Sequence, residues 1–477
     1  MQPFTLEEFK EQAKTSKSVA VFAEIPAGLL TPVDIYKVLN KVYKNGAILE
    51  NLHEEGSHRY AHICFEPVKT LSIPYGSKRH LLNELRNINS QLRYSTRQDV
   101  AHLITKMIGF ITYDAASSFE NVTDYQANQQ ALPLCLFHFY HLNLTLDYTN
   151  KTLLISTIAD ANTELDLAYH QACEKIKTII TLLTHASFEQ ESCINNKISE
   201  RVAVDISDED FMQMVSKAKE YITRGDAFQI VISRSFKRCY SVTPLAIYKT
   251  LREISPAPFM FYFPTQHQTI IGASPERLLR VHQNEVTINP IAGTRKRMNG
   301  QSDESICDEL LNDKKELAEH MMLVDLARND VGAVSKPGSV KVNELLKVKH
   351  YSHVSHITST VTGQLQEKYD ALDALKSNIP AGTLSGAPKI RAMQIIAELE
   401  KVPRGLYGGA ICRFDLSDQF DSCIAIRMAV LQDGIATIRA GAGIVYDSDP
   451  YTEAQETHQK ANALLDAIAK AHGEQAA

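Results

Sequence analysis

The stretch CIAIRMAVLQDGIATIRAGAGIVYD, residues 423–447, decides the fold class of this chain. Two apolar runs flank Asp433-Gly434, a dipeptide that accepts the positive φ angles of the tight turn between antiparallel strands. Residues 132–158 predict a second hairpin that turns near Asn150. Because hairpins join antiparallel neighbours, the sequence predicts an α+β fold of mostly antiparallel sheets with helices outside.

The chain divides into two parts of different pattern. Residues 1–185 alternate strands and helices and end in a long amphipathic helix. Residues 186–205 are polar and lose periodicity, which predicts a linker. The second part, residues 206–470, begins with a helix capped by Ser207 and contains the hairpin of residues 423–447. We therefore expect an N-terminal domain, a linker and a larger C-terminal domain.

Bulk composition excludes several classes of protein. The 477 residues carry a net charge of -6, and no basic run is interleaved with aromatic residues, which argues against a nucleic-acid partner. No apolar stretch approaches the length of a membrane span, and the first residues lack a signal-peptide core. The eight cysteines are scattered, which is typical of a reducing compartment. We expect a cytoplasmic enzyme that binds neither nucleic acid nor membrane.

Two carboxylate pairs lie on segments with helical patterns. Glu316 and Glu319 belong to an apolar-periodic stretch, and Glu453 and Glu456 follow Pro450, which is typical of a first helical turn. Residues three apart share one face of a helix. Four carboxylates with room for water suit Mg²⁺, although such pairs are more often a solvated helix face.

A glycine-rich run and an arginine suggest a binding site for an anion. Gly441-Ala442-Gly443 lacks a dinucleotide fingerprint, but its backbone N–H groups can bind a carboxylate; a tight turn is the alternative. Arg427 lies in an apolar strand, on the face of Cys423 and Ala425. Its partner is either a carboxylate of the protein or a carboxylate of the substrate. Tyr407 lies in a glycine-rich turn where the backbone can approach a ligand.

Two further groups are candidates for acid–base chemistry. Glu276 follows Ser274-Pro275 at the end of a strand and is either a general acid or a turn residue. His353 and His356 lie on a β-branched strand and point to opposite faces, so they are a poor pair of metal ligands. One of them can serve as a lone acid or base, and a satisfied core histidine is the alternative.

These pieces together resemble the chorismate-utilising enzyme family. The resemblance rests on ordered blocks, dense from residue 208 to about 468: GDAFQIVISR (225–234), GASPERLL (272–279), PIAGTR (290–295), ELAEHMMLVDLARND (316–330), YSHVSH (351–356), PAGTLSGAPK (380–389), YGGA (407–410), CIAIRMA (423–429), GAGIVYDSDP (441–450) and EAQETHQKA (453–461). The family's fold is a two-sheet sandwich flanked by helices, and the same fold is expected here.

The resemblance implies a role for each matched residue. Glu319 and Glu456 match the direct Mg²⁺ ligands, and Glu316 and Glu453 match residues that hold the metal's waters. Glu276 matches the general acid for the departing 4-hydroxyl, and His356 the histidine associated with removal of the C2 proton; Thr383 belongs to the same catalytic set. The residues that match the substrate site are Gly293, Thr294, Tyr407, Arg427, Gly441, Ala442, Gly443 and Lys460.

Two positions point to ammonia as the nucleophile. Family members that add water to chorismate carry lysine where this chain has Gln229, and a glutamine amide cannot act as a base. The aminodeoxychorismate synthases carry a nucleophilic lysine where this chain has Ala292, which forms no covalent intermediate. The chain therefore resembles the anthranilate-forming large subunits, in which ammonia attacks C2 and pyruvate then leaves.

The same resemblance implies a partner and a regulator. Because no glutaminase signature is present, a separate glutamine amidotransferase subunit is expected to supply ammonia. Pro258, Phe259 and Met260, with Asn51 in place of the usual serine, match the stretches that bind tryptophan as a feedback inhibitor. Two alternatives stay open: an aminodeoxychorismate synthase component, and a non-catalytic chorismate-binding regulatory subunit.

Overall fold

The computed structural model describes residues 4–52, 59–77, 80–122, 132–186, 201–296, 302–350 and 354–473. Within these ranges, every ladder between the named strands is antiparallel. In the same ranges we find no helix with the length and apolar character needed to span a bilayer.

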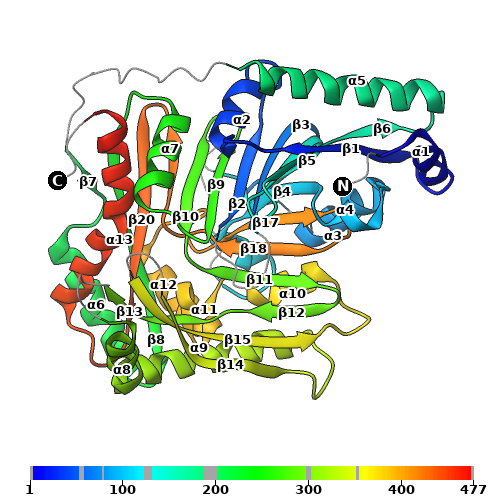
Figure 1. Cartoon of the computed structure of the whole chain (residues 1–477). Coiled ribbons are helices and arrows are strands. Elements are labelled where there is room, and N and C mark those ends of the chain that lie inside the picture. Colours follow the sequence, from blue (N-terminus) through cyan, green and yellow to red (C-terminus); the bar gives the residue numbers. More distant parts are fainter. Residues whose placement is uncertain are drawn as a thin grey trace.

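The first branch of paired strands runs from β1 to β8 (Figure 1). Its order is β1 (Ser18–Pro26), β6 (Thr152–Asp160), β5 (Cys135–Asp147), β3 (Tyr60–Ile73), β2 (Ala47–Asn51), β9 (Phe259–Pro264), β10 (Thr269–Ser274), β19 (Met428–Gln432), β20 (Ile435–Ile444) and β8 (Gln229–Cys239). Two short strands, β7 (Ala203–Val204) and β16 (Gly386–Ala387), add to β8.

The second branch leaves the first at β5, because the early residues of β5 pair with β4 and its later residues pair with β6. Its order is β4 (Thr105–Ile111), β17 (Ala410–Asp415), β18 (Phe420–Ile424), β11 (Arg277–His282), β12 (Glu285–Ile288) and β15 (Val354–Gln364). Both β13 (Ile291–Lys296) and β14 (Lys341–His350) also pair with β15.

A buried apolar cluster joins the two branches face to face. It includes Ala47 and Phe261 from the first branch and Phe110, Ile411 and Cys423 from the second. Burying apolar side chains between two sheets is what defines a sandwich. The predicted α+β fold, a two-sheet sandwich flanked by helices, is confirmed.

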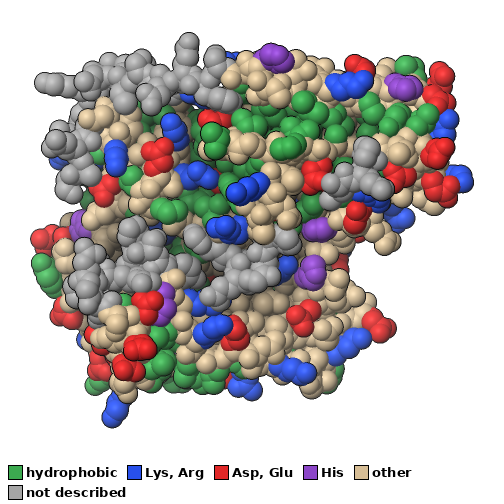
Figure 2. Space-filling model, viewed as in Figure 1, with side chains coloured by type: hydrophobic (Ala, Val, Ile, Leu, Met, Phe, Trp, Pro, Cys, Tyr) green, Lys and Arg blue, Asp and Glu red, His purple; other side chains and the backbone are tan. Residues whose placement is uncertain are grey.

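Helices cover the outer faces. Against the first branch pack α1 (Leu6–Ala13), α2 (Pro32–Leu39), α5 (Leu165–Thr184), α6 (Asp208–Thr223), α7 (Pro244–Ile254), α12 (Lys389–Glu400) and α13 (Pro450–Ala471). Against the second pack α3 (Leu81–Gln91), α9 (Lys314–Gly332) and α10 (Ala371–Asn378). The remaining helices are α4 (Gln98–Ala101), the 3₁₀ helix η1 (Tyr113–Ser118), α8 (Asp303–Asn312) and α11 (Gly382–Ser385). Figure 2 shows hydrophobic side chains gathered between α5 and the strands next to it.

The hairpin predicted at Asp433-Gly434 is confirmed. Gln432 pairs with Ile435, and the two turn residues have φ angles of 49° and 77°. Positive φ at both central positions gives the turn a twist that matches its flanking strands. The start of α13 also follows the sequence, with Asp449 as N-cap and Pro450 in the first turn.

Strand pairing connects the two predicted domains. β2 of the N-terminal part pairs with β9, and β4 pairs with β17. Residues 187–200 of the predicted linker lie outside the described ranges. The division at residues 186–205 therefore stays a prediction.

Candidate active site

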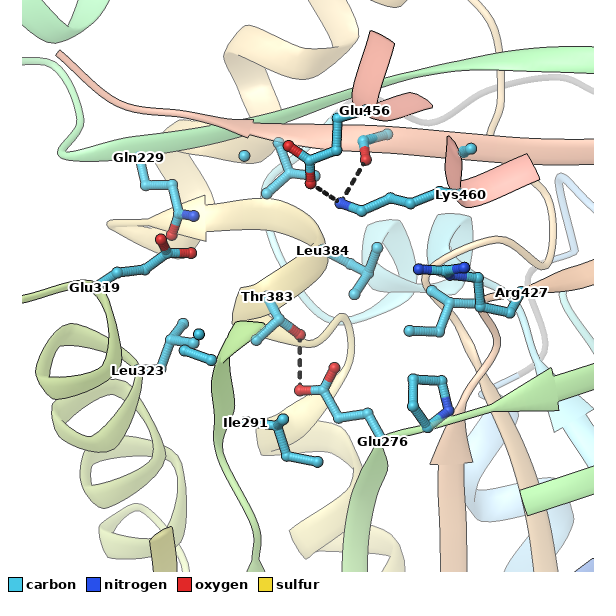
Figure 3. A pocket seen from close by; sticks show the side chains of 18 of the residues that line it. Gln229, Glu276, Ile291, Glu319, Leu323, Thr383, Leu384, Arg427, Glu456 and Lys460 are labelled. Atoms are coloured by element: carbon cyan, nitrogen blue, oxygen red, sulfur yellow. Dashed lines mark hydrogen bonds and ion pairs between the residues drawn. The ribbon is translucent and has the colours of Figure 1, made fainter. Parts of the chain in front are cut away.

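A cavity of about 410 Å³ lies where β8 and β20 of the first branch face β13 and β15 of the second. Its volume is in the range of small-molecule sites. Helices α9, α11 and α13 complete its wall, as Figure 3 shows from close by. The predicted site residues that line it are Gln229, Glu276, Ala292, Gly293, Glu316, Glu319, His356, Thr383, Tyr407, Arg427, Gly441, Gly443, Glu453, Glu456 and Lys460.

The two carboxylate pairs meet at this cavity from two helices. Glu316 and Glu319 come from α9, and Glu453 and Glu456 come from α13. Figure 3 shows the side chains of Glu319 and Glu456 directed into the same space. All four residues line this cavity, which favours the metal-site interpretation over a solvated helix face.

The carboxylates fit a magnesium site of low protein coordination. In the described part of the chain, no three His, Cys, Asp or Glu side chains are grouped closely enough to hold an ion by themselves. Mg²⁺ needs only one or two carboxylates when water and substrate oxygens fill its other positions. Lys460 lies 2.5 Å from Glu456, and Arg295 lies 3.1 Å from Glu316. Glu319 and Glu456, one from each helix, stay the predicted pair of ligands for the ion.

The carboxyl group of Glu276 has an unusually high pKa. It lies in the turn between β10 and β11, and desolvation by burial raises the pKa of its carboxyl to about 8. The hydroxyl of Thr383 donates a hydrogen bond to Glu276 Oε1 at 3.2 Å, which favours the carboxylate and opposes this rise. At neutral pH the carboxyl of Glu276 is mostly protonated and can give a proton to a leaving group.

His356 has the opposite character and is neutral. Burial lowers the pKa of its imidazole, the nearby charge of Arg427 lowers it further, and a bond to Gly293 partly opposes both effects. His356 Nδ1 lies 3.2 Å from the Gly293 carbonyl oxygen. A carbonyl can only accept, so Nδ1 carries the proton and Nε2 keeps its lone pair. The imidazole can therefore act as a base through Nε2.

Arg427 reaches the cavity because its strand is interrupted. The sequence predicts one strand through residues 423–430, with Arg427 on the face of Cys423 and Ala425. That prediction is wrong: β18 ends at Ile424, β19 begins at Met428, and Arg427 has a φ of 49°. The left-handed residue turns the backbone, so Arg427 lines the cavity while Cys423 and Ala425 stay in the apolar core.

Glycines bring the β20 backbone close to the other groups of the site. A Cβ at Gly441 would lie 2.5 Å from the Ile232 carbonyl oxygen and 2.8 Å from Tyr407 Oη, so only glycine fits. The Gly441 carbonyl accepts a hydrogen bond from Lys460 Nζ at 3.0 Å. Ala442 points the other way, into a core cluster, and does not line the cavity.

The residues that bear on the choice of nucleophile also lie at the cavity. Gln229 is almost fully buried, and its Nε2 would be 2.6 Å from a Cβ at Gly443. Ala292 lies on β13, next to the irregular register between Ala292 and Thr294. The Thr294 side chain, like residue His353, lies outside what the structure describes. The cavity therefore presents an amide and a methyl group at the positions where a lysine is predicted to change the reaction.

A second cavity of about 310 Å³ adjoins the predicted regulatory residues. Asn51 and Phe259 line it, together with Leu49 and Glu50. Asn51 Oδ1 is buried and has no hydrogen-bond partner among the described residues. A buried acceptor of this kind is costly unless a ligand or water completes it.

The rest of the predicted regulatory stretch is placed differently. Met260 is fully buried in the apolar core, and neither it nor Pro258 lines the second cavity. The Pro258 carbonyl instead accepts a hydrogen bond from the Leu52 N–H at 2.9 Å. Pro258 therefore holds the end of β2 beside β9, next to the cavity.

One charged residue of the cavity was missed by sequence reasoning. Arg439 lines the main cavity from β20, two residues before Gly441. Period-2 alternation puts residues 439, 441 and 443 on one face of the strand. Because Gly441 and Gly443 were already predicted to bind substrate, this alternation could have identified Arg439 as a residue of the same face.

Comparison with known proteins gives a consistent result. A family model described as chorismate binding enzyme matches residues 49–466. Anthranilate synthase component 1 of Acetivibrio thermocellus is 39% identical, with 98% of each chain covered, and that of Bacillus caldotenax is 37% identical, with 97% of this chain and 96% of the relative covered.

Solved structures show the same likeness. The crystal structure of anthranilate synthase component I from Streptococcus pneumoniae TIGR4 superposes with a TM-score of 0.78 at 32% identity, covering 92% of this chain and 99% of that one. MenF, the menaquinone-specific isochorismate synthase of Escherichia coli, superposes with a TM-score of 0.71 at 19% identity, covering 97% of this chain and 98% of that one, which shows a shared fold.

Proposed function

Because the chain belongs to the chorismate binding enzymes and, within them, to the anthranilate synthase component 1 family, we propose that it makes anthranilate from chorismate in the first step of tryptophan biosynthesis. Ammonia attacks C2, the 4-hydroxyl leaves as water, and pyruvate is then eliminated. One observation carries the proposal: a protonated acid, Glu276, and a neutral imidazole, His356, line one cavity with Gln229 and Ala292.

Glu276 supplies the proton for the first step. Attack at C2 shifts the ring double bonds and expels the 4-hydroxyl, which is a poor leaving group unless it is protonated. The raised pKa of Glu276 keeps its proton available at neutral pH, and the Thr383 hydroxyl holds the carboxyl in place. The product of this step is aminodeoxyisochorismate.

His356 removes the C2 proton in the second step. Its Nδ1–H points to the Gly293 carbonyl, which orients the ring and leaves Nε2 as the base. Loss of the C2 proton aromatises the ring as the enolpyruvyl group leaves as pyruvate.

We assign the two carboxylates of chorismate to different groups of the cavity. When bound, Mg²⁺ would neutralise the ring carboxylate and act as a Lewis acid, held by Glu319 and Glu456 with Glu316 and Glu453 around its waters. Tyr407, Arg427 and the Gly441 backbone hold the enolpyruvyl carboxylate, because a guanidinium and a phenol are the donors that suit it.

Gln229 and Ala292 restrict the nucleophile to free ammonia. Neither can take a proton from water or form a covalent adduct, whereas ammonia is nucleophilic when neutral. We propose that a glutamine amidotransferase subunit delivers the ammonia. The seven free cysteines found in the described residues suit the reducing cytoplasm, where we place the enzyme.

The second cavity supports a tryptophan-binding role with feedback inhibition. Asn51 Oδ1 can accept a hydrogen bond from the amino group of a ligand, and Phe259 offers an aromatic wall for an indole. Replacing Asn51 with leucine removes that acceptor at similar size. The half-inhibitory concentration of tryptophan, taken relative to each variant's uninhibited rate, should rise about tenfold. An unchanged value would remove Asn51 from the site.

The product identifies the reaction. With chorismate, Mg²⁺ and ammonium, the purified chain should form fluorescent anthranilate and pyruvate in equal amounts, and glutamine should replace ammonium only when the amidotransferase is added. Accumulation of a non-aromatic amine would point to an enzyme that stops before pyruvate leaves. An absence of turnover with and without the partner would contradict the proposal.

A further inference from the structure

Arg439 is a second guanidinium at the main cavity, in addition to Arg427. It lies on β20, on the same face as Gly441, whose backbone approaches Tyr407 Oη. The two arginines therefore flank the end of the cavity where Tyr407 lies. The roles proposed above use Arg427 and leave Arg439 without one.

Two hydrogen bonds fix the Arg439 side chain. Its Nε donates to Ser233 Oγ at 2.8 Å, and its Nη2 donates to Glu400 Oε2 at 2.6 Å. Nη1 makes none of the hydrogen bonds found among the described residues, although it carries two N–H groups. The side chain is thus held by one edge, and Nη1 is left for a ligand in the cavity.

Glu400 is the anchor of this arrangement. Its carboxylate is fully buried and accepts from the Ser233 N–H at 2.7 Å and from Arg404 Nη2 and Nε at 2.6 and 3.0 Å. Burial raises the pKa of Glu400, but the charges of Arg404 and Arg439 and the hydrogen bonds from Arg404 and Ser233 together leave the pKa below its usual value. Glu400 is therefore an anion held between two guanidinium groups.

The neighbouring groups leave this end of the cavity positive. One carboxylate lies between two guanidiniums, and burial raises the pKa of Tyr407 to about 12, so its phenol stays neutral. Asp114 accepts from the backbone N–H groups of Arg404 and Gly405 on the far side of Arg404 and does not line the main cavity. An anionic group of a ligand would complete the charge balance beside Arg439.

We propose that Arg439 is a second cationic contact for the enolpyruvyl carboxylate of the substrate, and that Glu400 is a positioning residue that keeps the guanidinium at the cavity wall. This inference rests on the proposed function, which supplies a substrate with two carboxylates. Arg427 and Arg439 together would bind the enolpyruvyl carboxylate, whereas the ring carboxylate would face Glu319 and Glu456.

Selective inhibition tests the contact. Pyruvate carries the side-chain carboxylate and benzoate carries the ring carboxylate, so each probes one end of the cavity. In Arg439→Gln, the KM for chorismate and the inhibition constant of pyruvate should rise about 10- to 100-fold, the range for a lost charge-assisted hydrogen bond. The inhibition constant of benzoate, measured with Mg²⁺, should stay within about twofold.

Two results would overturn the contact: an unchanged KM and pyruvate inhibition, or an equal weakening of benzoate and pyruvate, which would indicate a distorted cavity. Arg234 serves as a control because it is a fully buried arginine on the adjacent strand that bonds to Thr457 and backbone carbonyls outside the cavity. Arg234→Gln should lower Tm, but it should not change the inhibition constant of pyruvate relative to that of benzoate.

The positioning role is tested with Glu400→Gln and Ser233→Ala. Both changes should raise the inhibition constant of pyruvate more than that of benzoate. An unchanged inhibition constant of pyruvate in folded variants would overturn the role of Glu400. Glu400→Gln leaves two buried guanidinium groups without a counter-charge and can fail to fold. If it does not fold, the inhibition constants of Ser233→Ala alone test the positioning role.

Calorimetry separates this inference from the proposed function. Chorismate is titrated into the protein with Mg²⁺ and without ammonia, where no turnover occurs. If wild type binds chorismate in this titration but forms no anthranilate when ammonium is then added, the proposed function fails, and weaker binding by Arg439→Gln still supports the contact. If wild type binds no chorismate, both proposals fall.

Discussion

Thr383 Oγ1 donates a hydrogen bond to Glu276 Oε1 at 3.2 Å, inside the cavity that also contains His356. The bond stabilises the carboxylate form, whereas burial stabilises the neutral acid, and burial has the larger effect. The result is a carboxyl group with a pKa of about 8, which suits a general acid at neutral pH.

We predict that kcat falls as pH rises through about 8, because Glu276 is active when protonated and loses its proton above that pH. The dependence of kcat on pH is measured at a constant, saturating concentration of free ammonia, so that the titration of ammonium does not add a second pH dependence. Thr383→Val removes the bond that favours the carboxylate and should move this fall in kcat to higher pH. A fall that stays in place, or moves lower, would contradict the assignment of Glu276.

The carboxylates of α9 and α13 give a prediction about the metal. Glu319→Gln keeps the size of the side chain but removes its charge, so Mg²⁺-dependent turnover should fall at least 100-fold, about 3 kcal/mol of transition-state stabilisation. Higher Mg²⁺ concentrations should restore part of it. Glu367→Gln, at a highly exposed site that pairs with Lys336, is the matched control and should titrate like wild type. Wild-type magnesium dependence in Glu319→Gln would refute its role as a ligand.

A third prediction concerns stability at the hairpin. Gly434 has a φ of 77°, so Gly434→Ala puts a Cβ into the left-handed region and should lower the free energy of unfolding by about 1–2 kcal/mol. Gly332, the last residue of α9, has a φ outside that region, and a Cβ there would meet only Val340 Cγ2, at 4.0 Å. Gly332→Ala should therefore be neutral or stabilising by up to about 1 kcal/mol in denaturant unfolding. Equal effects of the two changes would contradict the turn geometry.

Local signals explain which parts of the fold were predictable. The Asp433-Gly434 turn and the Asp449-Pro450 start of α13 depend on residues that carry their own backbone preference. β14 gives only a weak signal because none of its residues is fully buried. β3 shows a local signal of another kind: it continues to Ile73 past Glu66, which has a φ of 57°, and past an irregular register at Pro67.

The site itself depends on contacts that no local pattern carries. The helical spacing of Glu316 and Glu319 predicts a shared face, but only the packing of α9 and α13 around one cavity turns that face inward. Arg427 depends on a left-handed backbone in a non-glycine residue, which tertiary packing imposes against local preference. Glu400 gave no signal, since its importance comes from burial between two arginines distant from one another in sequence.

The choice of nucleophile gives the last prediction. Gln229 is almost fully buried beside Gly443, and a lysine in its place would be desolvated, which lowers the pKa of its amine. A neutral amine at the cavity can take a proton from water, so Gln229→Lys should convert chorismate into a 2-hydroxylated product when ammonia is absent. In the presence of ammonia, anthranilate formation should fall at least tenfold as water competes. The products are separated by chromatography and identified by mass. Gln229→Met, which has similar length and no base, is the control and should form no hydroxylated product. If Gln229→Lys makes anthranilate at the wild-type rate and no hydroxylated product, position 229 does not select the nucleophile, and the reason this cavity aminates would have to lie in Ala292 or in the supply of ammonia.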